Sequence, residues 1–328
     1  MEKNNNKKRW LAAGLALLVL LVSLFTEGKQ TKIDENKIRK DALDKFYQME
    51  EEVLYGSNPM EKISVINVDG VIANDANNDT IVDMLEDARK DPSVVGVIMH
   101  INSPGGSVYA SEKIYKEINK LKETNKPVYA VMQELAASGG YYISAPCDKI
   151  FASNETWTGS IGVIMQSYSL EGLFEEYGIK EQNITTGKMK DAGSFGSDMD
   201  EEEKEYFQGL VDSAFGRFVK VVSEGRDMSE SEVKKIADGR VYDGSQALEN
   251  GLIDKIGDLE DAYKDMAESY NLSDPMLVEK YDVFSNFSKY FPGFKSTIDK
   301  PKSELEILKE FMNSDRKMPM YLYGGHYE

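Results

Sequence analysis

The alternation of short apolar runs with helix-like segments, from about residue 61 onward, constrains the fold of this chain most strongly. Val94–Met99 is apolar on both faces, which is typical of a strand buried inside a parallel sheet. Similar runs at Ile63–Val68 and Val128–Met132 are separated from it by segments whose apolar residues recur at the helical period. The first segment carries Ile81, Leu85 and Ala88, and the second carries Ala110, Ile114, Ile118 and Leu121. The pattern predicts an α/β fold of repeated strand–helix or strand–strand–helix units.

Further elements are predicted toward the C-terminus. Short strands are expected at Lys149–Ala152, Gly162–Met165 and Leu252–Asp254. A long helix is expected from about residue 200 to residue 223, because the acidic start Asp200–Glu203 suits the positive end of a helix dipole. Its apolar residues form a wide stripe at Phe207, Val211, Ala214, Phe215, Phe218 and Val222. We interpret the acidic start as helix capping, without a role in chemistry.

An uncharged run near the N-terminus predicts a membrane segment. Leu11–Phe25 carries no charge and directly follows Lys7–Trp10. The run is shorter than the roughly 20 residues that span a bilayer unaided, but an interfacial tryptophan and flanking cations can extend it. Bulky Leu24 and Phe25 do not form a small-x-small cleavage site, which favours an uncleaved anchor over a removed signal peptide. The positive flank predicts a cytoplasmic N-terminus and an extracytoplasmic remainder in the cell membrane.

The composition excludes several classes of function. The formal net charge of −18 argues against a nucleic-acid partner, because such partners attract basic surfaces. Cys147 is the only cysteine, so the chain forms no intrachain disulfide and holds no cysteine-rich metal site. The two histidines, His100 and His326, lie far apart in the sequence, which argues against a structural zinc site.

Ser138 is the candidate nucleophile, in a small-residue turn that leads into an apolar segment. A serine hydroxyl needs a base to take its proton. His100 ends a predicted strand and His326 lies two residues from the C-terminus, so neither histidine is placed for this role. A lysine can replace histidine if burial lowers its pKa from about 10.4 toward 7 to 8, which requires roughly 3 to 5 kcal/mol of differential environment.

Two lysines are candidates for this base. Lys188 and Lys190 would point to opposite sides of an extended segment, so at most one of them faces inward, and spacing alone does not choose between them. The turn Ser103–Gly106 follows a buried strand and offers N–H groups that can bind an oxyanion. The amide of Gly139, next to the nucleophile, can do the same. Taken singly, each of these features is more often a plain turn or a solvated lysine.

Five sequence blocks, taken in their order, closely resemble the signal peptide peptidase A family, membrane-anchored serine peptidases of the Clp/crotonase superfamily. The blocks are Ile101–Gly106, Ala137–Tyr142, Thr158–Val163, Lys190-Asp191 and Asp238–Tyr242. The resemblance covers about residues 60–270 and implies a Clp/crotonase-like fold. It implies that Ser138 is the nucleophile and Lys190 the general base, and that Ser160 hydrogen-bonds the lysine amine. It also implies that Gly106 and Gly139 are the oxyanion-hole donors.

The resemblance has further implications for activity. The proteolytic subunits of Clp share two of the turns but use histidine as base, whereas Val163–Gln166 after the third block contains no histidine. A serine–lysine dyad is therefore favoured, and it needs neither metal nor cofactor. The substrates implied are remnants of cleaved signal peptides and other unfolded hydrophobic peptides, and the assembly implied is a ring-shaped homo-oligomer.

These inferences divide the chain into four parts. Residues 1–26 are the cytoplasmic flank and transmembrane anchor, and residues 27–58 are charged and weakly helical, as in a stalk or linker helix. Residues 59–272 are the peptidase catalytic domain, and residues 273–328 are a C-terminal extension to which the sequence assigns no role.

Two alternative functions remain open. A crotonase-type acyl-CoA hydratase or isomerase would use the same oxyanion hole, but an extracytoplasmic domain is remote from the CoA pool. A catalytically silent membrane scaffold would keep only the fold. The pairing of Ser138 with Lys190 argues against both.

Overall fold

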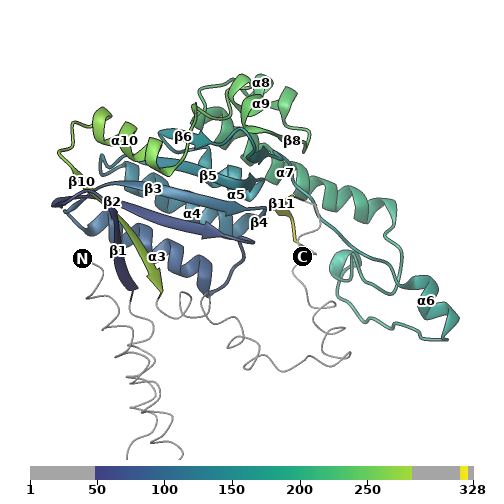
Figure 1. Ribbon diagram of the computed structural model, residues 1–328. Helices are drawn as coiled ribbons and strands as arrows, with labels where there is room; N and C mark the ends of the chain where they lie inside the picture. Colours follow the sequence, from purple (N-terminus) through teal and green to yellow (C-terminus); the bar gives the residue numbers. More distant parts are fainter. Residues whose placement is uncertain (1–48, 283–317, 324–328) are drawn as a thin grey trace, which may run out of the picture. The chain divides into compact units, whose positions relative to one another are not determined.

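A nine-stranded sheet organises the part of the chain that the computed structural model describes, residues 49–282 and 318–323 (Figure 1). The main path of the sheet runs in the order β1 (Met49–Tyr55), β10 (Pro275–Asp282), β2 (Asn58–Asp69), β3 (Val94–Ser103), β5 (Val128–Ala137), β6 (Lys149–Ala152) and β9 (Lys255–Ile256). Neighbouring strands from β10 to β9 are parallel. The prediction of an α/β fold is confirmed as a mixed α/β architecture with a large, mostly parallel sheet.

Two short strands extend the sheet beyond the end of β5. β7 (Trp157–Gly159) pairs in parallel with Leu135–Ala137, and β8 (Val241–Tyr242) pairs antiparallel with β7. A separate pair consists of β4 (Gly105–Ser107) and β11 (Met320–Leu322). Both additions lie beside the carboxyl end of β5, where ligand sites of parallel sheets are commonly found.

Helices cover both faces of the sheet because its central strands are apolar on both faces. On one face, α3 (Ala76–Lys90), α4 (Val108–Lys122) and α5 (Gly139–Ser144) pack in the larger core cluster. On the other face, α10 (Leu259–Ser269) packs in a smaller cluster with residues of β2, β3, β5 and β6. The predicted apolar faces of α3 and α4 are buried in the first of these clusters.

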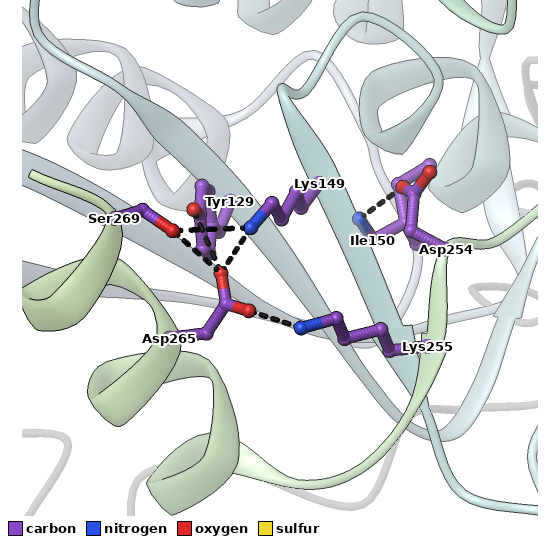
Figure 2. A network of polar contacts seen from close by, with 7 residues as sticks. All are labelled: Tyr129, Lys149, Ile150, Asp254, Lys255, Asp265 and Ser269. Carbon is purple, nitrogen blue, oxygen red and sulfur yellow. Dashed lines mark hydrogen bonds and ion pairs between the residues drawn. The ribbon is translucent and has the colours of Figure 1, made fainter.

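A polar network fixes α10 to the sheet (Figure 2). The carboxylate of Asp265 accepts hydrogen bonds from the Tyr129 hydroxyl, at 3.0 Å, and from the amines of Lys149 and Lys255. Burial opposes ionisation of Asp265, but these hydrogen bonds outweigh it and lower the pKa of its carboxyl group to about 2. The charged carboxylate is therefore a structural partner for both lysines.

The long predicted helix is confirmed as α7 (Glu201–Gly225). The Asp200 carboxylate caps it by accepting from Glu203 N–H, and the Glu203 carboxylate accepts from Asp200 N–H. The buried part of its apolar stripe consists of Ala214, Phe218 and Val222. The remaining short helices are α6 (Glu171–Glu176), η1 (Lys188–Lys190), α8 (Glu230–Ile236) and α9 (Gly244–Glu249).

Two predicted strands are wrong. Gly162–Met165 is not a strand, because residues distant in sequence fix the backbone of this segment. Ser160 donates its N–H to Arg240 O, and Ile164 forms only an isolated bridge with Met320. Leu252–Asp254 is not a strand either, because Leu252 N–H closes α9 by donating to Ala247 O.

Strands also occur outside the predicted catalytic domain. Residues 49–55 of the predicted linker helix form β1, and the predicted C-terminal extension contributes β10 and β11. Among residues 49–282 and 318–323, no helix is long and apolar enough to cross a bilayer. The predicted anchor at residues 11–25 lies outside the described residues.

Candidate active site

Ser138 forms a sharp turn between β5 and α5. Its backbone has φ 54° and ψ −113°, in the positive-φ half of conformational space where few residues other than glycine are found. Such a conformation costs about 1 to 3 kcal/mol and persists only where the surrounding structure enforces it. Here Ser138 donates its N–H to Gly159 O and accepts at its own carbonyl from Tyr142 N–H, both at 2.8 Å. The turn holds the serine in one strained orientation.

The Ser138 hydroxyl is buried and unpaired in the described part of the chain. The residue is 1% exposed, and its Oγ has no hydrogen-bond partner among the described residues. A buried hydroxyl in a folded protein nearly always has a partner, so one without a partner calls for an explanation. Strain and an unpaired hydroxyl at the same residue are typical of a reactive site.

The predicted oxyanion turn lies directly beside Ser138. The Ser103 hydroxyl donates to Gly70 O at 2.6 Å and accepts from Gly105 N–H at 3.1 Å, which holds the turn at the end of β3. Gly105 has φ 91°, and a Cβ added to it would overlap the amide of Gly139. Only glycine therefore allows the two backbones to approach so closely. The structure brings the predicted donors Gly106 and Gly139 to one place.

Ser160 lies on the other side of the nucleophile. β7 pairs Gly159 with Ala137, so Ser160 and Ser138 are the residues that follow a matched pair in two adjacent parallel strands. Ser160 is 6% exposed and also has a positive φ, 48°. Its N–H donates to Arg240 O, so the last predicted block, Asp238–Tyr242, supports this turn.

Lys190 is not joined to this group. The lysine is exposed in η1, and no hydrogen bond connects its amine to Ser138 in the described part of the chain. The predicted extended segment is wrong, because residues 188–190 form a single 3-10 turn. Lys188 is held elsewhere: its amine pairs with Glu202 and lies 3.7 Å from Asp200. The hydrogen bond with Glu202 raises the pKa of Lys188, which disfavours it as a base.

The segment that carries Lys190 extends away from the sheet, with α6 at its far end in Figure 1. Apolar side chains on it lie in solvent: Leu173, Tyr177, Ile179 and Ile184. Tyr177 is 71% exposed and Ile184 is completely exposed. This segment, residues 163–200, is called the α6 arm below.

A segment that the sequence left without a role lies across the oxyanion turn. β11 pairs antiparallel with β4, with Tyr321 opposite Gly106, and Tyr323 N–H donates to Pro104 O at 2.8 Å. On its other side, Met320 exchanges two backbone hydrogen bonds with Ile164, at 2.8 and 3.0 Å. β11 therefore bridges the two turns that flank Ser138, as an extended peptide would.

The side chain of Tyr321 packs in the larger core cluster. It is fully buried, and its hydroxyl donates to Ala214 O at 3.0 Å. Its ring lies 4.7 Å from the rings of both Tyr142 and Phe218. The apolar and aromatic run at residues 320–323 could have indicated a strand, but its partner is more than 200 residues away and no local pattern points to it.

A strained serine with an unpaired hydroxyl, next to converging backbone amides, is the arrangement expected of a serine hydrolase. Comparison with known proteins gives the family. The model of peptidase family S49 matches residues 120–273, and the Clp protease model matches residues 48–155. The chain belongs to peptidase family S49, the family of signal peptide peptidase A, and is a serine peptidase.

Individual relatives agree with this assignment. The chain is 37% identical to "Putative signal peptide peptidase SppA" of Enterococcus faecium, over 98% of this chain and 99% of the relative. It is 35% identical to "Protease 4" of Haemophilus influenzae, over 80% of this chain and 43% of that protein. It is 36% identical to "Serine protease SPPA, chloroplastic" of Arabidopsis thaliana, over 55% of this chain and 26% of that protein. These relatives favour a peptidase over an acyl-CoA hydratase or isomerase.

Proposed function

We propose that this serine peptidase is a membrane-bound endopeptidase that cleaves remnants of signal peptides and other unfolded hydrophobic peptides with a Ser138/Lys190 dyad. The observation that carries the proposal is the buried, unpaired hydroxyl of Ser138 on a strained turn. The buried packing of Tyr321, a side chain of the strand paired with β4, against Tyr142 and Phe218 supports a hydrophobic side chain at the same position of a substrate. The name of the Enterococcus relative supports signal peptides as the substrate class.

The proposed mechanism is acyl transfer. Neutral Lys190 takes the proton of the Ser138 hydroxyl as Oγ attacks the peptide carbonyl carbon. The backbone N–H groups of Gly106 and Gly139 donate to the oxyanion, and Ser160 orients the lysine amine. The lysine ammonium then protonates the leaving amine, and water hydrolyses the acyl-serine by the reverse sequence of proton transfers.

We further propose that Lys190 acts on Ser138 of a neighbouring copy in a ring-shaped homo-oligomer. Among the described residues of one chain, Ser138 Oγ has no hydrogen-bond partner, and Lys190 is exposed on the α6 arm with no hydrogen bond to Ser138. The exposed apolar residues of the arm are suited to packing on a second copy. One contact between copies would cover these residues and complete the dyad.

The remaining parts of the proposal concern fold and location. The mostly parallel sheet and the match to the Clp protease model support a Clp/crotonase-like fold of repeated strand–strand–helix units. The uncharged run at residues 11–25, which follows a basic flank, supports a single-pass anchor with the catalytic domain outside the cytoplasm. An anchored site of this kind would meet signal-peptide remnants where they are left.

A complementation experiment tests the dyad and the assembly together. Ser138→Ala and Lys190→Ala are purified separately, and each is expected to be inactive on a fluorogenic hydrophobic peptide. When the two proteins are unfolded, mixed and refolded together, copies with an intact pair form and activity returns. Activity in Ser138→Ala alone would refute the proposed nucleophile. Two inactive variants that fail to complement, although they assemble, would refute the shared dyad.

A further inference from the structure

Ser111 presents a second buried hydroxyl without a partner near the active site. It lies in α4, is completely buried, and its Oγ has no hydrogen-bond partner in the described part of the chain. Leaving such a hydroxyl unpaired costs about 1 to 3 kcal/mol, so its retention calls for a reason. The proposed mechanism gives Ser111 no role.

The position of Ser111 supplies a reason. A Cβ added to Gly139 would lie 2.7 Å from Ser111 Oγ, 3.0 Å from Gly105 Cα and 3.1 Å from Gly106 N. The Ser111 hydroxyl and the Gly106 amide therefore both lie close to Gly139. The buried hydroxyl is a neighbour of the backbone that provides both proposed oxyanion donors.

The fold keeps this arrangement rigid. α4 begins directly after β4, and Ser107 caps its N-terminus by accepting from Ala110 N–H at 3.4 Å. Ser111 is thus separated from Gly106 by little more than one helical turn. Further along the helix, the Tyr115 ring lies 5.4 Å from that of Tyr142 in α5, so α4 and α5 are packed together. The packing of α4 on α5 therefore holds the backbone of Ser111 near Gly139.

We propose that Ser111 is a positioning residue of the oxyanion hole. Its hydroxyl lies beside the Gly139 backbone, and its hydrogen-bonding capacity, not its volume, orients the amides of Gly106 and Gly139. Its O–H dipole is free to turn toward the negative charge that develops between them. The inference rests on the proposed roles of Ser138, Gly106 and Gly139, and adds a residue outside the five sequence blocks.

The proposal predicts an effect on the transition state and little effect on binding of the substrate. An interaction that strengthens only as charge develops changes kcat and leaves KM unaltered. Loss of a direct oxyanion donor costs roughly 10² to 10³ in kcat. Because Ser111 acts through the backbone donors, its loss is expected to cost less, about tenfold.

Ser64 provides a matched control. It is a buried serine of β2 whose Oγ also has no partner among the described residues, but its neighbours in the sheet are Val97 and Val278, which belong to no active-site turn. Ser64→Ala removes an equivalent unpaired hydroxyl away from the chemistry. A purely structural role for Ser111 predicts that Ser111→Ala behaves in the same way as Ser64→Ala.

The experiment compares Ser111→Ala, Ser111→Cys, Ser64→Ala and Ser138→Ala in the full-length protein. For each, kcat and KM on a hydrophobic peptide, inhibition by a peptide aldehyde and the melting temperature are measured. The aldehyde forms a tetrahedral adduct on serine and so reports on the oxyanion hole. Cysteine keeps roughly the volume of serine but is a weak donor, which separates packing from hydrogen bonding.

We expect kcat to fall about tenfold in both Ser111 variants, with aldehyde binding weakened by a similar factor and KM and the melting temperature close to those of Ser64→Ala. Wild-type kcat in Ser111→Ala would overturn the proposal. Full activity in Ser111→Cys would also overturn it, because packing alone would then suffice. Retained activity in Ser138→Ala would instead refute the proposed function, so the two failures are distinguishable.

Discussion

The two ends of strand β5 differ in whether their polar side chains are hydrogen-bonded. Near its start, Tyr129 donates to Asp265, and two lysines pair with the same carboxylate (Figure 2). Just beyond its end, the hydroxyl of Ser138 is buried without a partner on a strained backbone. The hydrogen bonds near the start of β5 stabilise the fold, whereas the unpaired Ser138 hydroxyl beyond its end is the proposed nucleophile. The contrast predicts which substitutions affect stability and which affect activity.

The largest expected effect lies at the second end. Ser138→Ala and Lys190→Ala should each reduce peptide cleavage by roughly 10⁴-fold or more, because removal of one member disables a catalytic unit. Lys188→Ala should retain most activity, since the Lys188 amine pairs with Glu202. Steady-state kinetics on the three variants, with circular dichroism to confirm folding, checks this prediction. An inactive Lys188→Ala beside an active Lys190→Ala would reverse the assignment of the base.

The next effect concerns the close approach of the two glycine turns. Gly105→Ala should lower kcat by roughly 10² to 10³, the usual cost of a lost oxyanion donor, because the added methyl group displaces the Gly139 amide. Gly209→Ala is the control. Gly209 lies in α7 with open space around it, so alanine there should stabilise the helix by about 0.5 to 1 kcal/mol. Equal kcat values for the two variants would contradict the proposed oxyanion hole.

The network near the start of β5 predicts that loss of the Asp265 carboxylate charge lowers the stability of the fold in a pH-dependent way. The pKa of Asp265 is about 2, below its ordinary value of 3.8. Its ionised form therefore stabilises the fold fully above about pH 4, by roughly 2 kcal/mol, and this contribution disappears as the pH falls through about 2. Asp265→Asn should lose a similar amount in urea unfolding at pH 7, without a change in kcat.

A control separates this network from ordinary surface pairs. Glu260→Gln removes the partner of Lys264 on the same helix, in an exposed pair that solvent screens and that should contribute little to stability. Both variants are measured across pH 2 to 7. A difference between wild type and Asp265→Asn that stays constant from pH 7 to pH 2 would show that the carboxylate charge is not the cause.

Local patterns predicted the elements whose partners are close in sequence. Ile81, Leu85 and Ala88 follow the helical period and are buried in α3, and Val94–Met99 lies within β3. These predictions succeeded because side-chain periodicity depends on local backbone geometry. The strand predicted at Gly162–Met165 is wrong because Arg240, which is distant in sequence, fixes the turn before it.

The candidate site was predicted in part for the same reason. The turns at Gly106, Ser138 and Ser160 each follow a strand, and adjacent strands bring them together. Periodicity could not predict the position of Lys190, because its segment is a 3-10 turn on an arm outside the sheet. Ser111 lies in a regular helix, where a buried serine has no distinguishing local pattern.

The smallest effect we predict concerns β11, which shares its position with the proposed substrate. β11 pairs along the predicted oxyanion turn, and we expect a substrate peptide to pair with β4 at the same place, so the two would compete. If β11 is seated about 90% of the time, the apparent affinity for substrate falls about tenfold. A protein that ends at residue 317 should therefore have a KM up to about tenfold lower, with kcat unchanged. Tyr321→Ala should act in the same direction, because it removes the ring contacts with Tyr142 and Phe218 that hold β11 in place.

Leu322→Ala is the matched control for this last prediction, because successive side chains of a strand point to opposite faces. Leu322 is only partly buried, whereas Tyr321 is completely buried, so Leu322→Ala should leave KM close to that of wild type. Peptide kinetics and melting temperatures are measured for all three variants. Competition predicts a fall in KM at constant kcat; a rise in KM, or a fall in kcat with the melting temperature preserved, would mean that β11 helps to form the site rather than occupying it. In that case β11 would have a structural role beside Ser138, as Asp265 has near the start of β5.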